Sequence, residues 1–381
     1  DDVMAIDTSG VPFNFIDVQF SPEEGSEVSE NLGDQETLIV VADIGDLEAP
    51  TSVEEARRLV FEKAEGTVQD FYDKNSFSKT SLVGDVVGPY KLSDECNEEE
   101  EESLKAAEPD VEKLGKSLSD YERLILAIPC NSKCGSCPGG SGTIGKSKIY
   151  LQDGREFRMS VSWDYSFGLS VVGHELGHNF GVHHGNRYVC FNPDGKRVSF
   201  SLDCESHEYG DPYTIMGGSS RHHNAPHKKE IGWLDDENII VAKSGTYEIS
   251  PIESMDTKNQ IKMIAIPIEI ETSYYSNEDN LFYTIELRQP IDYDIGFSNE
   301  IYKGISIRIA KLSEEDDSTS LQSSVVMPIE NRYGEWLLEG ESYIDEINGY
   351  KITLKNLEGE GKNAVAKVEI ENIPKKGLNF D

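Results

Sequence analysis

Long apolar runs are absent from the sequence. The apolar runs at residues 38–42 (LIVVA) and 124–128 (LILAI) have the length of buried strands, whereas a helix that spans a bilayer needs roughly 18 apolar residues. We therefore expect no insertion into a membrane. A leader with a basic and an apolar part is also absent from residues 1–10, so no signal peptide is expected there. A processed secreted protein and a cytosolic protein would both begin in this way.

Positive charge is scarce. The chain has 35 Lys and Arg residues against 71 Asp and Glu residues, which gives a formal net charge of −36. Such a surface repels phosphate groups, which argues against broad binding to nucleic acids and against docking on anionic lipids. It suits a protein that stays soluble in salty surroundings. Carboxylates also bind Ca2+, so calcium is compatible with this composition, although the sequence has no Asp-x-Asp-x-Asp-Gly loop.

The sequence lacks Asn-x-Ser/Thr glycosylation sites, and it contains six cysteines. An even number of cysteines is compatible with three disulfides, whose pairing the spacing does not determine. We predict a Cys190–Cys204 disulfide, which closes a short loop, and a second disulfide between Cys96 and one cysteine of the cluster at residues 130–137. The missing glycosylation sites favour secretion from a bacterium over passage through a glycosylating pathway.

Histidine is absent outside residues 174–227, which hold all eight histidines of the chain. Four of them lie in the stretch VVGHELGHNFGVHHGN at residues 171–186. The apolar spacing of residues 166–181 predicts a helix that ends at Gly181, a residue suited to a left-handed cap. His174 and His178 are four residues apart, so their rings project from the same face of this helix. That geometry suits two nitrogen ligands of one Zn2+ ion.

The same stretch supplies a third ligand and a general base. Gly181 allows the chain to turn sharply and to bring His184 back to the metal, and the spacing selects His184 over its neighbour His183. Three protein ligands leave the fourth tetrahedral position open, which is typical of a catalytic rather than a structural zinc site. Glu175 lies beside the first ligand, within reach of a water molecule on the metal. We therefore expect one catalytic zinc ion, with Glu175 as the catalytic residue.

The pattern His-Glu-x-x-His-x-x-Gly-x-x-His that begins at His174, followed by Met216 in the stretch EYGDPYTIMGGSS, resembles the metzincin zinc metalloproteases. Together with KEIGWL it is most similar to the gametolysin-type secreted peptidases. The resemblance implies an α/β (α+β) catalytic domain with a twisted mixed sheet and an active-site helix. It also implies a turn that places Met216 under the metal.

The sequence departs from related families in one respect. Astacin-like and serralysin-like enzymes carry a tyrosine two residues after this methionine, whereas this chain has Gly218. The hydroxyl that such a tyrosine offers to the transition state is therefore not available from that position. Tyr213, His222 and His223 lie near Met216 in the sequence, and they are candidate residues of the substrate pocket.

These observations predict a secreted zinc endopeptidase that hydrolyses extracellular proteins or peptides. Zinc would activate a water molecule and polarise the peptide carbonyl, while Glu175 would take the proton of the water and deliver it to the departing amine. The resemblance implies that the strand before the active-site helix pairs with the substrate, and residues 155–163 are the candidate edge strand. The alternative is an adhesin or binding protein in which a β domain carries the main role. The substrate and the oligomeric state are left open.

Predicted strands and helices alternate up to residue 181. Buried strands are expected at residues 37–44, 80–88 and 121–130. Residues 51–74 predict one helix, whose start carries a capping box at Ser52 and Glu55. Residues 98–118 predict helical structure in which Pro109 starts a second piece. This alternation predicts an α/β layer.

The pattern changes after about residue 240. Segments rich in β-branched residues follow one another at residues 261–270, 281–289, 304–312, 350–357 and 364–370, which predicts an all-β sandwich. We therefore expect three parts in the chain. Residues 1–35 would be an N-terminal extension packed on the catalytic domain, residues 36–238 the zinc metalloprotease domain and residues 239–381 the β-sandwich domain.

A second metal motif competes with the histidines. Cys130, Cys134 and Cys137 have the spacing Cys-x3-Cys-x2-Cys, which also occurs where radical enzymes bind a [4Fe–4S] cluster. In those enzymes the triplet follows the first strand of a barrel, and here a whole α/β segment precedes it. The cluster also leaves the distant histidines unexplained. We favour a loop tied by disulfides, with a structural zinc site and an iron–sulfur cluster as the alternatives.

Overall fold

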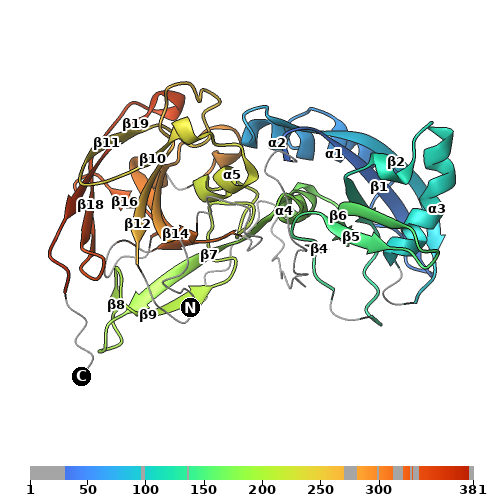
Figure 1. Ribbon diagram of the computed structural model, residues 1–381, viewed down its shortest axis with the longest axis horizontal. Helices are drawn as coiled ribbons and strands as arrows, with labels where there is room; N and C mark the ends of the chain where they lie inside the picture. The colour runs from blue at the N-terminus through green and yellow to red at the C-terminus, as the bar shows by residue number, and fades with distance from the viewer. Residues whose placement is uncertain are drawn as a thin grey trace. The chain divides into compact units, whose positions relative to one another are not determined.

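The computed structural model describes residues 31–95, 99–134, 137–269, 281–297, 300–311, 321–326, 328 and 334–376. These residues form two compact units, 31–183 and 184–376 (Figure 1). Both are built from sheets with few helices, so the chain has a mixed α/β structure. Of the extension expected at residues 1–35, residues 1–30 lie outside the described part. The domain boundary predicted after residue 238 stays a prediction.

The first unit is built around a mixed sheet. Its elements are β1 (Gly33–Ile44), α1 (Val53–Phe61), α2 (Val68–Asn75), β2 (Thr80–Leu92), α3 (Glu99–Lys113), β3 (Arg123–Ala127), β4 (Gly140–Gly142), β5 (Ser147–Tyr150), β6 (Glu156–Asp164) and α4 (Leu169–Asn179). The strand order is β2-β1-β3-β6-β4, and β5 also pairs with β6. The first four strands are parallel, whereas β4 and β5 run antiparallel to β6. The three strands predicted here are confirmed.

Helices cover this sheet because β1 is apolar on both faces. Leu38 and Val40 pack in one core with Leu104 and Val111 of α3. Ile39, which points to the opposite face, is completely buried as well. Helices α1 and α2 contact β2, while α4 contacts β4 and β6. A continuous apolar run with both faces buried is the usual signature of a parallel strand.

The predicted helix at residues 51–74 is two helices. Ser52 caps α1 by accepting a hydrogen bond from the backbone of Glu55, as predicted. The chain then breaks at Gly66, whose φ is +83°, and Thr67 caps α2 by accepting from the backbone of Asp70. The apolar spacing continued through this break, and therefore did not reveal the second start.

Pro109 lies inside α3 and does not start a second helix, contrary to the prediction. Its ring removes one backbone donor from the helix. Leu104 before it and Val111 after it are both fully buried in the same core. Packing on both sides of the proline thus outweighs the lost hydrogen bond.

The prediction that residues 155–163 form an edge strand is wrong. They contribute to β6, which lies inside the sheet with β3 on one side and with β4 and β5 on the other. Within the described residues, the short strand β4 occupies the end of the sheet. It comes before β6 in the chain and is only three residues long, so its sequence gave little strand signal.

The second unit contains two sheets and one α-helix among its described residues. Its elements are β7 (Val182–Phe191, whose first two residues belong to the first unit), β8 (Arg197–Val198), β9 (Asp203–His207), α5 (Ala225–Ile231), β10 (Ile239–Val241), β11 (Gly245–Ile249), β12 (Met263–Ile268), β13 (Leu281–Leu287), β14 (Gly304–Lys311), β15 (Leu321–Val326), β16 (Leu337–Leu338), β17 (Ser342–Asp345), β18 (Tyr350–Glu358) and β19 (Val365–Asn372). The larger sheet has the order β10-β12-β13-β14-β15-β7-β8, with β16 paired to β14 and β9 to β7; the smaller has the order β11-β19-β18-β17.

The two sheets of this unit share one hydrophobic core. Ile264 and Ile285 of the larger sheet belong to the same buried cluster as Ile352 and Val368 of the smaller. All five strands predicted after residue 240 are confirmed at β12, β13, β14, β18 and β19. The structure is therefore compatible with the predicted β domain, although β7 to β9 were not predicted as strands.

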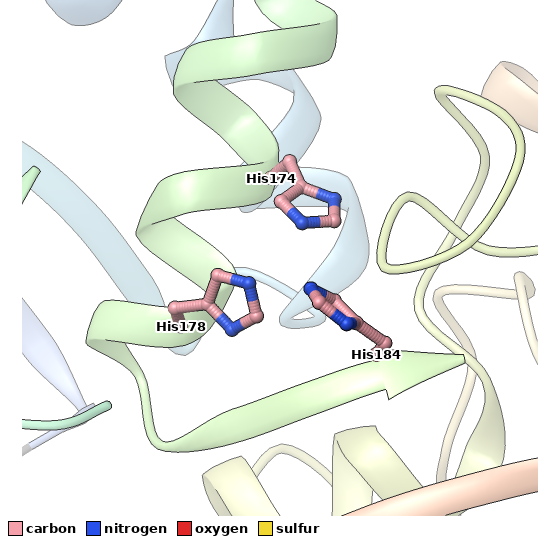
Figure 2. Close-up of side chains that lie close together, drawn as sticks. All are labelled: His174, His178 and His184. Carbon is pink, nitrogen blue, oxygen red and sulfur yellow. The ribbon is translucent and has the colours of Figure 1, made fainter. Parts of the chain in front are cut away.

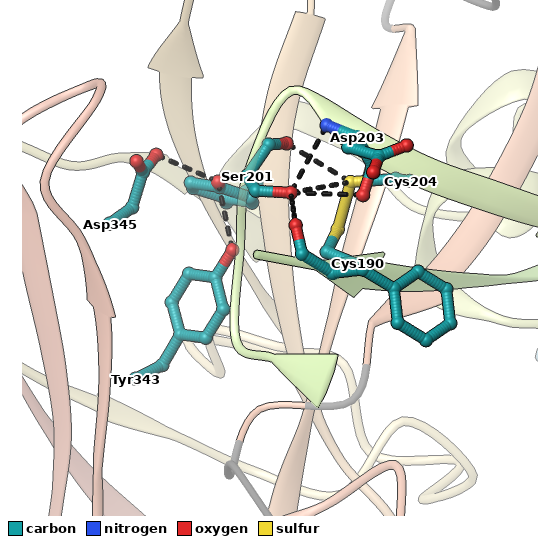
Figure 3. Close-up of a disulfide and its surroundings, with 8 residues drawn as sticks. Cys190, Ser201, Asp203, Cys204, Tyr343 and Asp345 are labelled. Carbon is teal, nitrogen blue, oxygen red and sulfur yellow. Dashed lines mark hydrogen bonds between the residues drawn. A yellow bond between two sulfur atoms is a disulfide. The ribbon is translucent and has the colours of Figure 1, made fainter. Parts of the chain in front are cut away.

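The disulfide Cys190–Cys204 is confirmed, and it joins directly paired residues of β7 and β9 (Figure 3). Nearby, Tyr283 donates a 2.8 Å hydrogen bond to Asp345 and accepts one of 2.9 Å from Tyr343, which ties the two sheets together. These bonds satisfy polar groups that the core would otherwise leave unpaired.

Cysteines also tie the loop after β3. Cys130 pairs with Cys137, and Cys134 is disulfide-bonded too. Cys96, which we predicted to be the disulfide partner of one of these cysteines, lies outside the described residues. The loop at residues 130–137 is thus the disulfide-tied loop that the sequence favoured. Every helix of the described chain is too short or too polar to traverse a bilayer.

The buried carboxyl group of Asp164 makes the stability of the first unit depend on pH. Asp164 ends β6, is completely buried and accepts a 2.8 Å hydrogen bond from Ser162. Burial raises the pKa of Asp164 to about 7. The folded state then binds the proton more tightly than the unfolded state, so the free energy of unfolding falls as the pH rises from about 4 to about 7.

We predict that Asp164→Asn removes this loss of stability. The free energy of unfolding of the variant should exceed that of the wild type by a growing amount as the pH rises from about 4 to about 7. The difference should reach about 4 kcal/mol at pH 8. Urea unfolding at a series of pH values measures it. A difference that is the same at pH 4 and pH 8 would show that the pKa of Asp164 is the same in the folded and unfolded states.

Candidate metal centre

Helix α4 presents two histidines on one face. Gly168 precedes its first turn, and its residues from Val171 to Asn179 are all buried. His174 and His178 lie one turn apart, and their ring centroids are separated by 4.8 Å at an interplanar angle of 82° (Figure 2). The spacing of four residues therefore brings the two rings together, as predicted.

Contacts of the first unit fix this helix. Tyr72 on α2 donates a 2.6 Å hydrogen bond to the carbonyl of Gly173, and burial raises the pKa of Tyr72 well above its ordinary value, so that its hydroxyl stays protonated. At the other end, the buried Arg123 donates a 2.9 Å hydrogen bond to the carbonyl of Asn179, and Asn31 donates one of 3.1 Å to Phe180. A cation at a helix C-terminus is favourable because it meets carbonyl groups without helical partners.

The third histidine comes back after a sharp turn. Gly181 has a φ of +101°, a conformation that glycine adopts without strain, and β7 starts at the next residue. The ligand atoms that His174, His178 and His184 can offer all lie within 4.8 Å of one another, and the three residues are buried. This group could hold a metal ion. It is the single group of this kind among the described residues.

Hydrogen bonds select the nitrogen atoms that face the centre. His178 Nδ1 lies 2.8 Å from the carbonyl oxygen of Val182, and His184 Nδ1 lies 2.8 Å from Glu208 Oε1. Carbonyl and carboxylate oxygens accept hydrogen bonds, so both Nδ1 atoms carry the proton in these contacts. The lone pair of each ring is then on Nε2. Contacts of this kind orient the ring of a metal-binding histidine and raise its basicity.

Sequence reasoning missed two residues that hold His184. The Glu208 carboxylate binds its Nδ1, as described above, and the Tyr209 ring lies against the imidazole at a centroid distance of 3.9 Å. Tyr209 has a φ of +57°, which is uncommon for a residue with a side chain, and its backbone donates a 3.2 Å hydrogen bond to Asn186. No spacing rule links residues 208 and 209 to the histidines, so the sequence offered no signal for them.

Glu175 lies where two glycines make room for it. The side chain is buried, with 1% of its surface exposed. A Cβ atom on Gly140 would lie 2.8 Å from Glu175 Oε1, and one on Gly142 would lie 3.2 Å from Oε2. The first distance is too short for a real contact and the second is a tight one, so β4 approaches the carboxylate closely because both positions lack a side chain. Like Glu208, these glycines were missed from the sequence.

Met216 is fully buried in a tight turn. Its carbonyl oxygen accepts a 2.7 Å hydrogen bond from the backbone of Gly185, the residue after His184. The turn is therefore fixed to the strand that carries the third histidine. The position of Met216 relative to the metal stays a prediction.

The three candidate pocket residues are all buried in the second unit. Tyr213 donates a 3.0 Å hydrogen bond to Glu335, and burial, together with the Glu335 charge, raises the pKa of the phenol far above its ordinary value. The backbone of His222 donates to Asp294, and the His223 ring packs edge-on against Trp233. Their predicted role in the pocket stays a prediction.

We predict that Glu208→Ala weakens metal binding by about 10- to 100-fold, because loss of the carboxylate frees His184 to rotate and lowers its basicity. The dissociation constant for Zn2+, measured by competition with a chelator, tests this. Glu205→Ala is a matched control, since Glu205, which lies on β9, is exposed like Glu208 and lies near His207. Equal affinity in the two variants would contradict the role given to Glu208.

The sequence was compared with protein-family models and with curated proteins. No protein-family model matches the chain, and no curated protein is significantly similar to it. The candidate centre is therefore characterised by its own geometry: three buried imidazoles, two of them on the helix that also carries the buried Glu175.

Proposed function

We propose that this protein is a secreted zinc-dependent endopeptidase of the metzincin type. His174, His178 and His184 would bind the zinc ion, and Glu175 would act as the general base. The observation that carries the proposal is the meeting of three buried imidazoles, two of which lie on the helix that also carries the buried Glu175. This combination of residue types matches a metal-assisted hydrolase better than a structural metal site.

The donor set suits zinc. Two of the three imidazoles have their Nδ1 atoms engaged by oxygen acceptors, which leaves neutral Nε2 atoms as ligands. Three nitrogen ligands from the protein are typical of catalytic zinc, with the fourth position open. When bound, zinc would polarise the substrate carbonyl and make water a stronger nucleophile at neutral pH.

Glu175 would move the proton. It directly follows His174 on α4, and its carboxylate is held against the backbone of β4. As general base it would accept a proton from the attacking water, and as general acid it would then deliver that proton to the departing amine. The close packing at Gly140 and Gly142 would keep the carboxylate in one position during both transfers.

A peptide substrate is supported by the place of β4. This strand ends the sheet of the first unit within the described residues, and it lies against Glu175. An extended peptide can add to the edge of a sheet through main-chain hydrogen bonds. We propose β4, in place of residues 155–163, as the strand that pairs with the substrate.

A turn at Met216 is expected in a member of the proposed family. The chain has Gly218 at the position where astacin-like and serralysin-like enzymes have a tyrosine. Secretion is supported by the disulfides Cys130–Cys137 and Cys190–Cys204, since disulfides persist in oxidising surroundings. The acidic surface fits an extracellular protein and does not identify the substrate.

We predict that Glu175→Gln lowers casein or gelatin cleavage by about 100- to 10,000-fold, because the amide cannot accept the proton of water. The wild type should carry one zinc per chain and lose activity in a chelator, whereas the variant should still carry zinc. Cleavage rate and zinc content are measured together. Zinc in both proteins with cleavage in neither would favour the binding protein over the peptidase.

We predict that Gly140→Ala lowers cleavage by about 100-fold with zinc content unchanged, because the new Cβ would displace the Glu175 carboxylate. Gly168→Ala is the control: a Cβ there meets nothing within 4 Å, and the φ of −157° suits alanine. Full activity of Gly140→Ala would contradict the role given to β4 in holding Glu175.

A further inference from the structure

The backbone beside the third ligand is held by a closed loop at residues 211–218. Gly185, which follows His184, donates a 2.7 Å hydrogen bond to the carbonyl of Met216 and accepts one of 3.0 Å from the backbone of Asp211. Gly218 closes the loop by donating a 3.0 Å hydrogen bond to the carbonyl of Asp211. Two residues of the loop, Asp211 and Met216, thus hold the backbone of Gly185, the residue next to His184.

Packing leaves this loop little freedom. A Cβ atom on Gly185 would lie 2.5 Å from Thr214 Cγ2, and one on Gly217 would lie 2.0 Å from the carbonyl oxygen of Asp211. Gly185 therefore packs directly against the Thr214 side chain, and Gly217 packs directly against the Asp211 backbone. A shift of Asp211 would move Gly185, and His184 with it.

Asp211 is anchored by a buried ion pair. Its Oδ2 accepts a 2.8 Å hydrogen bond from Arg308 Nε, and both side chains are completely buried. Its Oδ1 accepts a 3.0 Å hydrogen bond from the backbone of Tyr213, inside the loop. The carboxylate therefore joins the loop to β14, the strand that carries Arg308.

Arg308 is itself fixed on two sides. It lies within β14, where its backbone is paired with Thr284 of β13 and with Val325 of β15. Its Nη1 contacts Glu286 Oε1 of β13 at 2.7 Å. A guanidinium group held by two carboxylates has a defined orientation, which a flexible ammonium group does not reproduce.

We propose that Arg308 is a positioning residue of the metal centre, which holds His184 in ligand geometry through Asp211 and Gly185. Strand β14, which belongs to the part of the sequence expected to form a separate β domain, then contributes to metal binding. This inference rests on the metal-binding part of the proposed function and is independent of peptidase activity.

The test compares full-length wild type with Arg308→Met, Arg308→Lys and Arg288→Met. Arg288 is the matched control, because it is also completely buried and bound to Glu286, while its other hydrogen bonds go to Asp294 and the carbonyl of His222. The readouts are the Zn2+ dissociation constant and the visible spectrum of bound Co2+. Circular dichroism and the thermal transition confirm that each variant is folded.

We expect Arg308→Met to bind Zn2+ about 10- to 100-fold more weakly, with an altered Co2+ spectrum. Arg308→Lys should recover part of the affinity, and Arg288→Met should bind Zn2+ as the wild type does. If Arg308→Met does not fold, Asp211→Asn answers the same question, since it keeps an acceptor for Tyr213 but loses the ion pair.

Two results would overturn the inference while leaving the zinc centre intact. One is wild-type affinity in a folded Arg308→Met or Asp211→Asn variant. The other is an equal loss of affinity in Arg308→Met and Arg288→Met, which would reduce the effect to general destabilisation. A wild type that binds neither Zn2+ nor Co2+ would overturn the proposed metal centre itself.

Discussion

The meeting of three imidazoles at one point is the constraint on which the rest of the site depends. Two of them meet because a helix places residues four apart on one face. The third, His184, arrives because Gly181 takes a left-handed conformation and reverses the chain into β7. Each ring then needs an acceptor on its far nitrogen, and the Val182 carbonyl and Glu208 supply two of these. Burial makes such acceptors necessary, since an unpaired polar group away from water is costly.

Support for the ligands comes from residues far apart in the sequence. Within the first unit, Tyr72 and Arg123 hold α4 from elements that precede it by many residues. Within the second unit, Glu208 holds the His184 ring, and the Asp211–Arg308 pair holds the backbone beside it. Buried ion pairs seldom add much net stability compared with apolar residues of the same size, but they fix geometry when every partner is present. Such a role is consistent with a pair placed so close to a candidate ligand.

The sequence predicted what local spacing determines. His174, His178 and His184 lie within eleven residues of one another, so helix geometry and one glycine sufficed to expect their meeting. The late strands were predictable because β-branched residues mark them. Residues that act over long range, such as Glu208 and Arg308, carry no periodic signal, and the break at Gly66 was hidden by apolar spacing that runs through it. The edge strand was misplaced because β4 has only three residues, two of them glycine.

We propose that three imidazoles, those of His174, His178 and His184, hold a zinc ion. X-ray absorption at the zinc edge, on the full-length protein loaded with one equivalent of Zn2+, tests it most directly. We expect a first shell of nitrogen and oxygen atoms at about 2.0–2.1 Å, with the outer-shell scattering that imidazole rings produce and no sulfur. Sulfur ligands at about 2.3 Å would instead place the metal on the cysteines and rule out zinc binding by the histidines.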